Sequence, residues 1–148
     1  MLQFTKVPLP RLQALNARNM QTALQESAQA TIHTDADATA LVAFRAEHAD
    51  LSLEALVARA VIRSFTAFPH INARISVDGL SVYHSVNLGL MVVLDKGVIV
   101  PVIDSAEHLS LRALDAALSE FAEKARTGAL RPSETRSATF TVASLADH

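Results

Sequence analysis

The stretch HSVNLGLMVVLDKGVIVPVIDSAEHLSL, residues 84–111, decides the fold. Two apolar runs, residues 86–94 and 98–103, flank Asp95-Lys96-Gly97, where the glycine can adopt a positive φ. This pattern predicts a β-hairpin. Both arms are apolar on both faces, and such strands are covered on both sides. We therefore expect this hairpin to be central in a sheet.

Three further parts of the chain are predicted to be β-structure. Residues 73–77 and 80–84 flank Asp78-Gly79, which is a strong two-residue hairpin signal. Residues 31–34 are mostly β-branched and polar, and we expect a strand there. Residues 139–145 form the last predicted strand. The hairpins indicate a mostly antiparallel sheet.

Apolar residues at helical spacing and capping residues at the ends predict four helices. Proline disfavours helix before it, so the segment that precedes the first helix is expected to be an extended arm. Helices packed on a mostly antiparallel sheet define the α+β class. The predicted elements are the arm at residues 4–10, helices at 11–26, 38–48 after Asp37, 53–68 between Ser52 and Pro69, and 111–127 between Ser110 and Gly128, and a connection at 131–136 with a helical turn after Pro132.

Composition narrows the class of protein. The chain has 148 residues, of which 50% are hydrophobic, so we expect one domain with a sizeable core. Lys+Arg 13 against Asp+Glu 15 gives a net charge of −2, which excludes a broadly basic nucleic-acid binder. The chain has no cysteine, so disulfides and cysteine-based metal sites are excluded. No apolar run is long enough for a membrane span, and we expect a cytoplasmic protein.

Several segments, in collinear order, match the sequence pattern of one enzyme family. They are VPLPRLQALNARNMQTALQESAQATIHTDADATALVAFR at 7–45, LSLEALVARAVIRSFTAFPHINARI at 51–75, residues 84–111 with Val-Asn-x-Gly and Gly-x-x-Val-Pro-Val-Ile, FAEKARTGALRP at 121–132, and ATFTVASLA at 138–146. With these segments the chain resembles the CoA-dependent catalytic domain of the dihydrolipoamide acyltransferases of 2-oxo acid dehydrogenase complexes. The match runs the whole length of the chain.

The resemblance implies a fold, an activity and partners. The implied fold is a chloramphenicol-acetyltransferase-like two-layer α+β sandwich, with residues 1–148 as a single, partial catalytic domain that is incomplete at its C-terminal side. The implied activity is transfer of an acyl group between dihydrolipoamide and CoA. CoA is then a substrate, and the lipoyl group is carried on another domain. The implied partners are the other subunits of a homotrimer or of a higher oligomer built from trimers, a lipoyl domain and the other components of the complex.

The resemblance also implies where catalytic groups lie. Ser144 falls at the position of the hydroxyl that hydrogen-bonds the tetrahedral oxyanion in this family. The family's general base is the histidine of a His-x-x-x-Asp-Gly signature, and no histidine of these 148 residues occupies that position. We therefore expect this chain alone to be inactive. Without the resemblance, a serine such as Ser144 is more typical of a turn after a strand.

Other polar residues have structural interpretations. We expect Asn72 and Asn87 to be buried polar residues that fix loops. The histidines are scattered and predict no metal site, and His148 at the chain end is not the missing base. Several arginines are expected to be solvated charges. The histidines are His33, His48, His70, His84, His108 and His148. The arginines are Arg74, Arg112, Arg126 and Arg131.

Two alternative functions stay open. A chain without the base could serve as a non-catalytic component of a trimeric assembly. It could also bind CoA or an acyl thioester without turnover. Binding of CoA without turnover would support the second alternative, and trimer formation without CoA binding would support the first.

Overall fold

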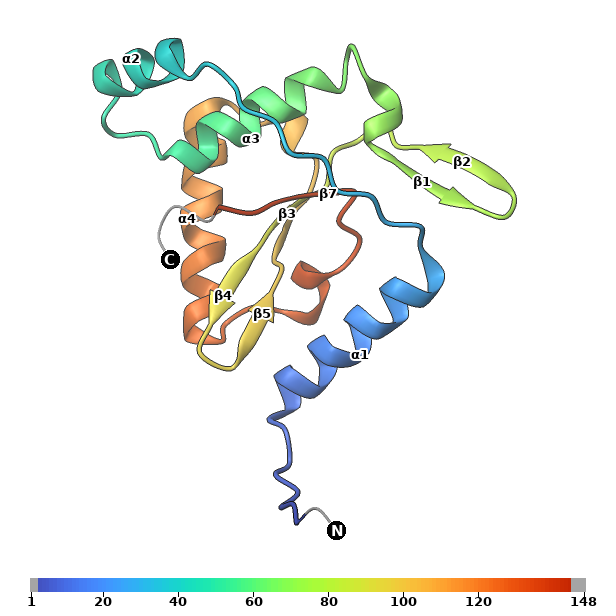
Figure 1. Ribbon diagram of the computed structural model, residues 1–148. Helices are drawn as coiled ribbons and strands as arrows, with labels where there is room; N and C mark the ends of the chain where they lie inside the picture. The colour runs from blue at the N-terminus through green and yellow to red at the C-terminus, as the bar shows by residue number, and fades with distance from the viewer. Residues whose placement is uncertain (1–2, 145–148) are drawn as a thin grey trace. The chain divides into compact units, whose positions relative to one another are not determined.

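Three strands form a sheet with the order β6-β3-β7, and Figure 1 labels two of them, β3 and β7. The computed structural model describes residues 3–144. β3 (Leu88–Leu90) pairs antiparallel with β6 (Val102–Ile103) and parallel with β7 (Phe140–Val142). All three residues of β3 are buried. The prediction of a central strand is therefore confirmed for β3.

Both arms of the predicted central hairpin are interrupted. The first arm divides at Met91 into β3 and β4 (Val92–Leu94), and the second divides at residues 100–101 into β5 (Gly97–Ile99) and β6. The Leu90 N–H bonds to the Pro101 carbonyl, but Pro101 has no N–H with which to continue the ladder. The Met91 N–H instead donates a hydrogen bond to the Val142 carbonyl at 3.0 Å. β4 and β5 consequently form a separate two-stranded ribbon.

The chain divides into two compact units, and one of them is built around α1 (Arg11–Glu26). This unit holds the described residues up to Asp35 together with residues 93–98. α1 has the predicted bounds, and Asn16 links it to β5. The Asn16 Nδ2 donates to the Val98 carbonyl at 3.0 Å, and the Val98 N–H donates to Asn16 Oδ1 at 2.9 Å. Gly97 has φ +141°, and a Cβ there would lie 2.5 Å from Asn16 Oδ1.

The predicted strand at residues 31–34 is wrong. These residues lie in an exposed, extended connection between α1 and α2, and no strand of the described residues pairs with them. Ile32 is 88% exposed. β-branched residues favour a strand only where a neighbouring strand and a buried face are available, and this segment has neither.

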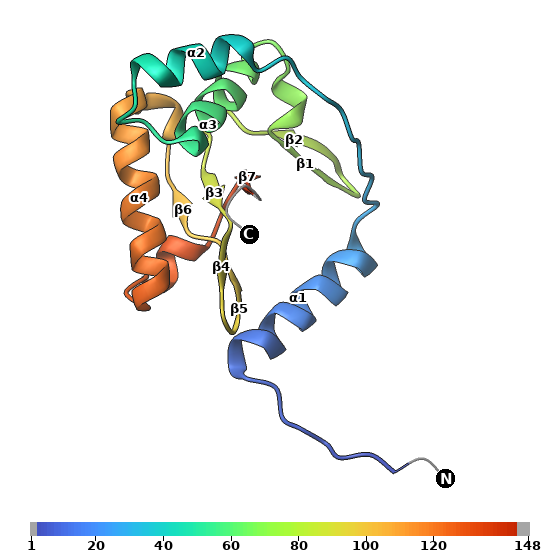
Figure 2. The same ribbon diagram turned by 60° about the vertical axis from the view of Figure 1, so that its left-hand side comes forward.

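The second unit holds the other three helices and most of the strands. α3 (Leu53–Ser64) and α4 (Leu111–Thr127) contact each other, and α4 also contacts β6 (Figure 2). Ser52 and Ser110 cap them as predicted, since each hydroxyl accepts an N–H three residues on, at 3.2 Å. Gly128 ends α4 with φ 71°, also as predicted. α3 ends four residues earlier than predicted, because the residue before Pro69 is disfavoured in a helix and the chain turns ahead of it.

The remaining elements are close to their predicted positions. α2 (Thr39–Glu47) begins one residue late, and Asp37 Oδ1 accepts the Thr39 N–H at 2.9 Å. The hairpin of β1 (Ala73–Ser76) and β2 (Gly79–Val82) turns at residues 77–78, one residue before the predicted pair. Ser76 Oγ accepts the Asp78 N–H, which fixes the earlier turn. The short 3-10 helices are η1 (Pro69–Ile71), η2 (Ala106–His108) and the predicted turn η3 (Pro132–Thr135).

The predicted last strand is shorter than expected and is parallel to its neighbour. β7 covers three residues of the predicted 139–145, and residue 145 lies outside the described residues. The other two pairings with a determined register, β1 with β2 and β3 with β6, are antiparallel as predicted. In the part of the chain that the structure describes, no helix is both long and apolar enough to cross a membrane. The α+β prediction is confirmed.

Candidate functional site

Ser144 lies two residues beyond the end of β7 and is half-buried. β7 pairs with β3 in the register Leu88 to Phe140, Gly89 to Thr141 and Leu90 to Val142. The hydrogen bond from the Met91 N–H to the Val142 carbonyl extends this pairing toward Ser144. Chemically, the Ser144 hydroxyl can donate a hydrogen bond to an oxygen that gains negative charge during a reaction.

Gly89 allows β7 to approach β3 closely. A Cβ on Gly89 would lie 2.7 Å from Thr141 Oγ1 and 2.8 Å from Val100 Cγ1, which is too close for any side chain. Gly89 therefore helps to position β7, the strand that precedes Ser144. In the sequence, Gly89 stood out only as the glycine of the Val-Asn-x-Gly motif.

Both asparagines that were predicted to be buried and to fix loops contact loop backbone, but only Asn72 is buried. Asn72 is 1% exposed, and its Nδ2 donates to the carbonyls of Tyr83 and Ser85, each at 3.1 Å. Asn72 therefore joins the end of η1 to the segment that follows β2. Asn87 is half-buried, and its side chain contacts the backbone of Ser105 and of Ser137. Asn87 thus connects β3 with the segments before η2 and β7.

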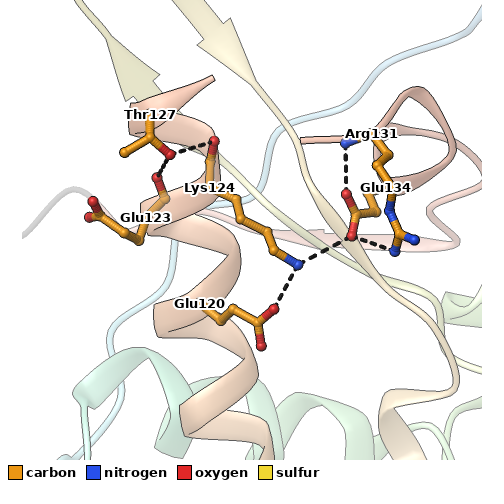
Figure 3. A network of polar contacts seen from close by, with 6 residues as sticks. All are labelled: Glu120, Glu123, Lys124, Thr127, Arg131 and Glu134. Carbon is orange, nitrogen blue, oxygen red and sulfur yellow. Dashed lines mark hydrogen bonds and ion pairs between the residues drawn. The ribbon is translucent and has the colours of Figure 1, made fainter. Parts of the chain in front are cut away.

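A buried carboxylate holds η3, the turn that precedes β7 (Figure 3). Glu134 is 7% exposed and accepts hydrogen bonds from the Arg131 N–H at 2.7 Å, the Arg131 guanidinium at 2.8 Å and the Lys124 ammonium at 3.4 Å. Lys124 also pairs with Glu120 at 2.6 Å. The hydrogen bonds from Arg131 lower the pKa of Glu134 to about 2. Sequence reasoning missed Glu134, although its position three residues after Arg131 and beyond Pro132 is typical of a capped turn.

Arg131 was predicted to be a solvated charge, and the structure refines that prediction. Its side chain is largely exposed, but the guanidinium is paired with Glu134. Arg112 is likewise exposed and paired with Asp50, and Arg126 lies 4.0 Å from Glu123. Arg74 is exposed on β1. The four arginines are thus surface charges, and three of them have acidic partners.

The described histidines lie on separate segments. His33 is in the exposed connection after α1, His48 stacks on Phe44 at 4.2 Å at the end of α2, and His108 lies 3.3 Å from Glu107. His70 is in η1 and His84 follows β2. No group of three His, Cys, Asp or Glu side chains among the residues described could hold a metal ion. His148 lies outside the described residues.

The fold is that of the catalytic cores of dihydrolipoamide acyltransferases. A structure of the Azotobacter vinelandii dihydrolipoamide acetyltransferase, used to investigate a serine, a histidine and an asparagine in its catalytic mechanism, matches with a TM-score of 0.86 and 31% identity. The match covers 97% of this chain and 63% of that chain. The cubic core of a pyruvate dehydrogenase multienzyme complex also matches with a TM-score of 0.86, at 30% identity over 97% of this chain and 63% of that one.

Sequence comparison gives the family. The model for 2-oxoacid dehydrogenases acyltransferase (catalytic domain) matches residues 2–147, and the chain belongs to that family. It is 32% identical, over 95% of its length, to the dihydrolipoyllysine-residue acetyltransferase component of the acetoin cleaving system of Bacillus subtilis. It is also 32% identical, over 97% of its length, to the acetyltransferase component of the Mycobacterium tuberculosis pyruvate dehydrogenase complex. The chain spans 37% and 28% of these two relatives.

Proposed function

We propose that this chain forms part of an acyltransferase site that moves an acyl group between dihydrolipoamide and CoA. The observation that carries the proposal is the family match over residues 2–147, in which Ser144 follows the strand β7. Ser144 acts as the oxyanion donor. The chain belongs to a family named for acyl transfer, and a hydroxyl at this place can stabilise a tetrahedral intermediate.

The proposed chemistry is thioester exchange. A general base takes the proton from the thiol of CoA or dihydrolipoamide, and the thiolate attacks the carbonyl carbon of the acyl thioester. The carbonyl oxygen becomes an oxyanion and accepts a hydrogen bond from Ser144. When the carbon–sulfur bond to the leaving thiolate breaks, the base returns its proton to that sulfur. The base is the histidine of the His-x-x-x-Asp-Gly segment that the family resemblance implies, outside these 148 residues.

The proposal includes assembly into trimers, or into larger oligomers built from them, in a cytoplasmic 2-oxo acid dehydrogenase complex with a lipoyl domain as partner. A solved relative is the cubic core of such a complex. This chain exposes a series of large apolar side chains on the arm and on α1, which has no buried residue. Exposed apolar surface of this extent is typical of a contact between subunits. The residues are Phe4, Val7, Leu9, Leu15, Met20 and Leu24.

The experiment is a steady-state assay of acyl transfer from acyl-CoA to dihydrolipoamide by the full-length protein. S144A is expected to lower kcat about 100- to 1,000-fold with little change in KM, because an oxyanion donor acts in the transition state. S119A, at an exposed serine of α4, is the matched control and keeps wild-type kcat.

Other results would replace the proposal. Equal kcat for S144A and wild type would remove Ser144 from the mechanism. CoA binding with no turnover by the full-length protein would support a binding module. Trimers that bind no CoA would support a purely structural role.

A further inference from the structure

Two serines have backbone conformations that favour glycine. Ser105 has φ 50° and Ser137 has φ 65°, and they are the non-glycine residues with positive φ in the described part of the chain. An L-residue with a side chain is strained in this region, so its surroundings must hold it there. Residues held in this way are frequent at functional sites. The contacts that hold these two serines are therefore informative.

A single side chain, that of Asn87, hydrogen-bonds the backbone of both serines. The Ser105 N–H donates to Asn87 Oδ1 at 3.2 Å, and Asn87 Nδ2 donates to the Ser137 carbonyl at 3.2 Å. One partner is a donor and the other is an acceptor, so the orientation of the amide is fixed. A carboxylate of the same shape would keep the bond to Ser105 and would set an oxygen against the Ser137 carbonyl.

The main chain of Asn87 holds the segment that leads into β7. Its N–H donates to Thr139 Oγ1 at 3.1 Å, and its carbonyl accepts the Thr139 N–H at 2.9 Å. The neighbouring Val86 is held on the other side, since its carbonyl accepts the Ala106 N–H at 2.8 Å and its N–H donates to Glu107 Oε2 at 2.9 Å. Asn87 is therefore anchored while three of its contacts fix residues 137–139.

β7 carries this placement toward Ser144. After Thr139, β7 passes Thr141, whose side chain lies so close to Gly89 that a Cβ on Gly89 would collide with it. The pairing of β7 ends where the Val142 carbonyl accepts the Met91 N–H. We propose that Asn87 is a positioning residue for Ser144. It fixes the start of β7, and the tight pairing with β3 transmits that position along the strand to the hydroxyl. The inference rests on the proposed role of Ser144 in acyl transfer.

The test is a double-mutant cycle between N87D and S144A in the full-length protein, read as kcat and KM for acyl transfer. N87D keeps the acceptor for Ser105 and loses the donor to Ser137. We expect N87D to lower kcat about 10- to 100-fold with KM within about twofold, which is the cost of a misplaced catalytic group. In the S144A background N87D should cause no further loss, because the group that it positions is gone.

Two variants control for loss of stability. S52A removes the cap of α3 in the same unit, and it is expected to lower the melting temperature while kcat stays at the wild-type value. S137G replaces Ser137 by glycine, which adopts a positive φ without strain and needs less support from Asn87. The double variant N87D/S137G should therefore recover part of the kcat lost in N87D. Should N87D fail to fold, T139V removes the hydroxyl that accepts the Asn87 N–H and enters the same cycle.

The outcomes separate this inference from the proposed function. Losses from N87D and S144A that multiply in the double variant would overturn the positioning role. A lower melting temperature with unchanged kcat in N87D would overturn it as well. If S144A itself keeps wild-type kcat, the proposed function fails before Asn87 is tested. If S144A loses activity and N87D does not, only the inference about Asn87 fails.

Discussion

At the scale of single residues, the best-connected carboxylate of the described chain is Glu134. Figure 3 shows its oxygens facing the Arg131 backbone, the Arg131 guanidinium and the Lys124 ammonium. Its pKa is lowered to about 2 from the ordinary value of 4.5. In the same network the pKa values of Arg131 and Lys124 are raised, chiefly by their hydrogen bonds to Glu134 and Glu120 respectively. The network joins the end of α4 to the turn before β7.

The lowered pKa of Glu134 predicts a pH dependence of stability. The unfolded state binds its proton at higher pH than the folded state, so this contribution is fully present above about pH 4.5 and is lost as the pH falls toward 2. E134Q should melt at a lower temperature than wild type at pH 6, and the difference should shrink between pH 4.5 and pH 2. Thermal melts monitored by circular dichroism check this. E26Q, at the end of α1, is the control, and a difference independent of pH would contradict the assignment.

At the scale of elements, capping residues located several helix ends correctly. α3 and α4 start where Ser52 and Ser110 predicted, and Gly128 ends α4. The segment at residues 31–34 had strand-forming residues but no partner, and no local pattern shows whether a partner exists. Pro101 stands in the sequence, but the break there was not predicted. The different pairing beyond it depends on β7, which lies 39 residues further along the chain and pairs with β3.

In the candidate site, too, local motifs were predictable from the sequence and contacts between distant residues were not. The position of Ser144 came from a resemblance of motifs, whereas the network around Asn87 depends on contacts between residues up to 52 positions apart. Nothing in local spacing predicts that one amide faces both Ser105 and Ser137. For Glu134 the bonds to Arg131 are local, but its contact with Lys124 on α4 is not visible in local spacing. Long-range hydrogen bonds therefore account for most of what the sequence did not reveal.

The contact between α3 and α4 supports a prediction at this scale. Asp115 Oδ1 on α4 accepts the Ser52 N–H at 3.1 Å and also the Ser52 hydroxyl, which in turn caps the Ala55 N–H. S52A should lower the free energy of unfolding by about 1 kcal/mol, the usual cost of a lost N-cap. D115A should be non-additive with S52A, since the two residues share one network. Urea titrations of the two single variants and the double variant measure this, and strict additivity would contradict it.

At the scale of the whole molecule, the chain has two kinds of surface. The unit that contains α3, α4 and the β6-β3-β7 sheet has a buried core that includes Leu88 and Leu114. The unit that contains α1 has none of its helical residues buried. The large apolar side chains of the extended arm before α1 are exposed as well. A segment of this composition gains stability when another surface covers it.

The proposed assembly predicts that the arm holds subunits together. F4S/V7S/L9S removes three large, exposed apolar side chains from the arm and should lower the mass of the oligomer in sedimentation equilibrium toward that of one subunit. Thermal stability of the unit with the buried core should change little, because these side chains contribute nothing to that core. I75S/V77S removes two exposed apolar side chains from the β1–β2 hairpin and is the matched control. If both variants dissociate the oligomer equally, the arm has no special role, and if neither does, the subunits associate through another surface.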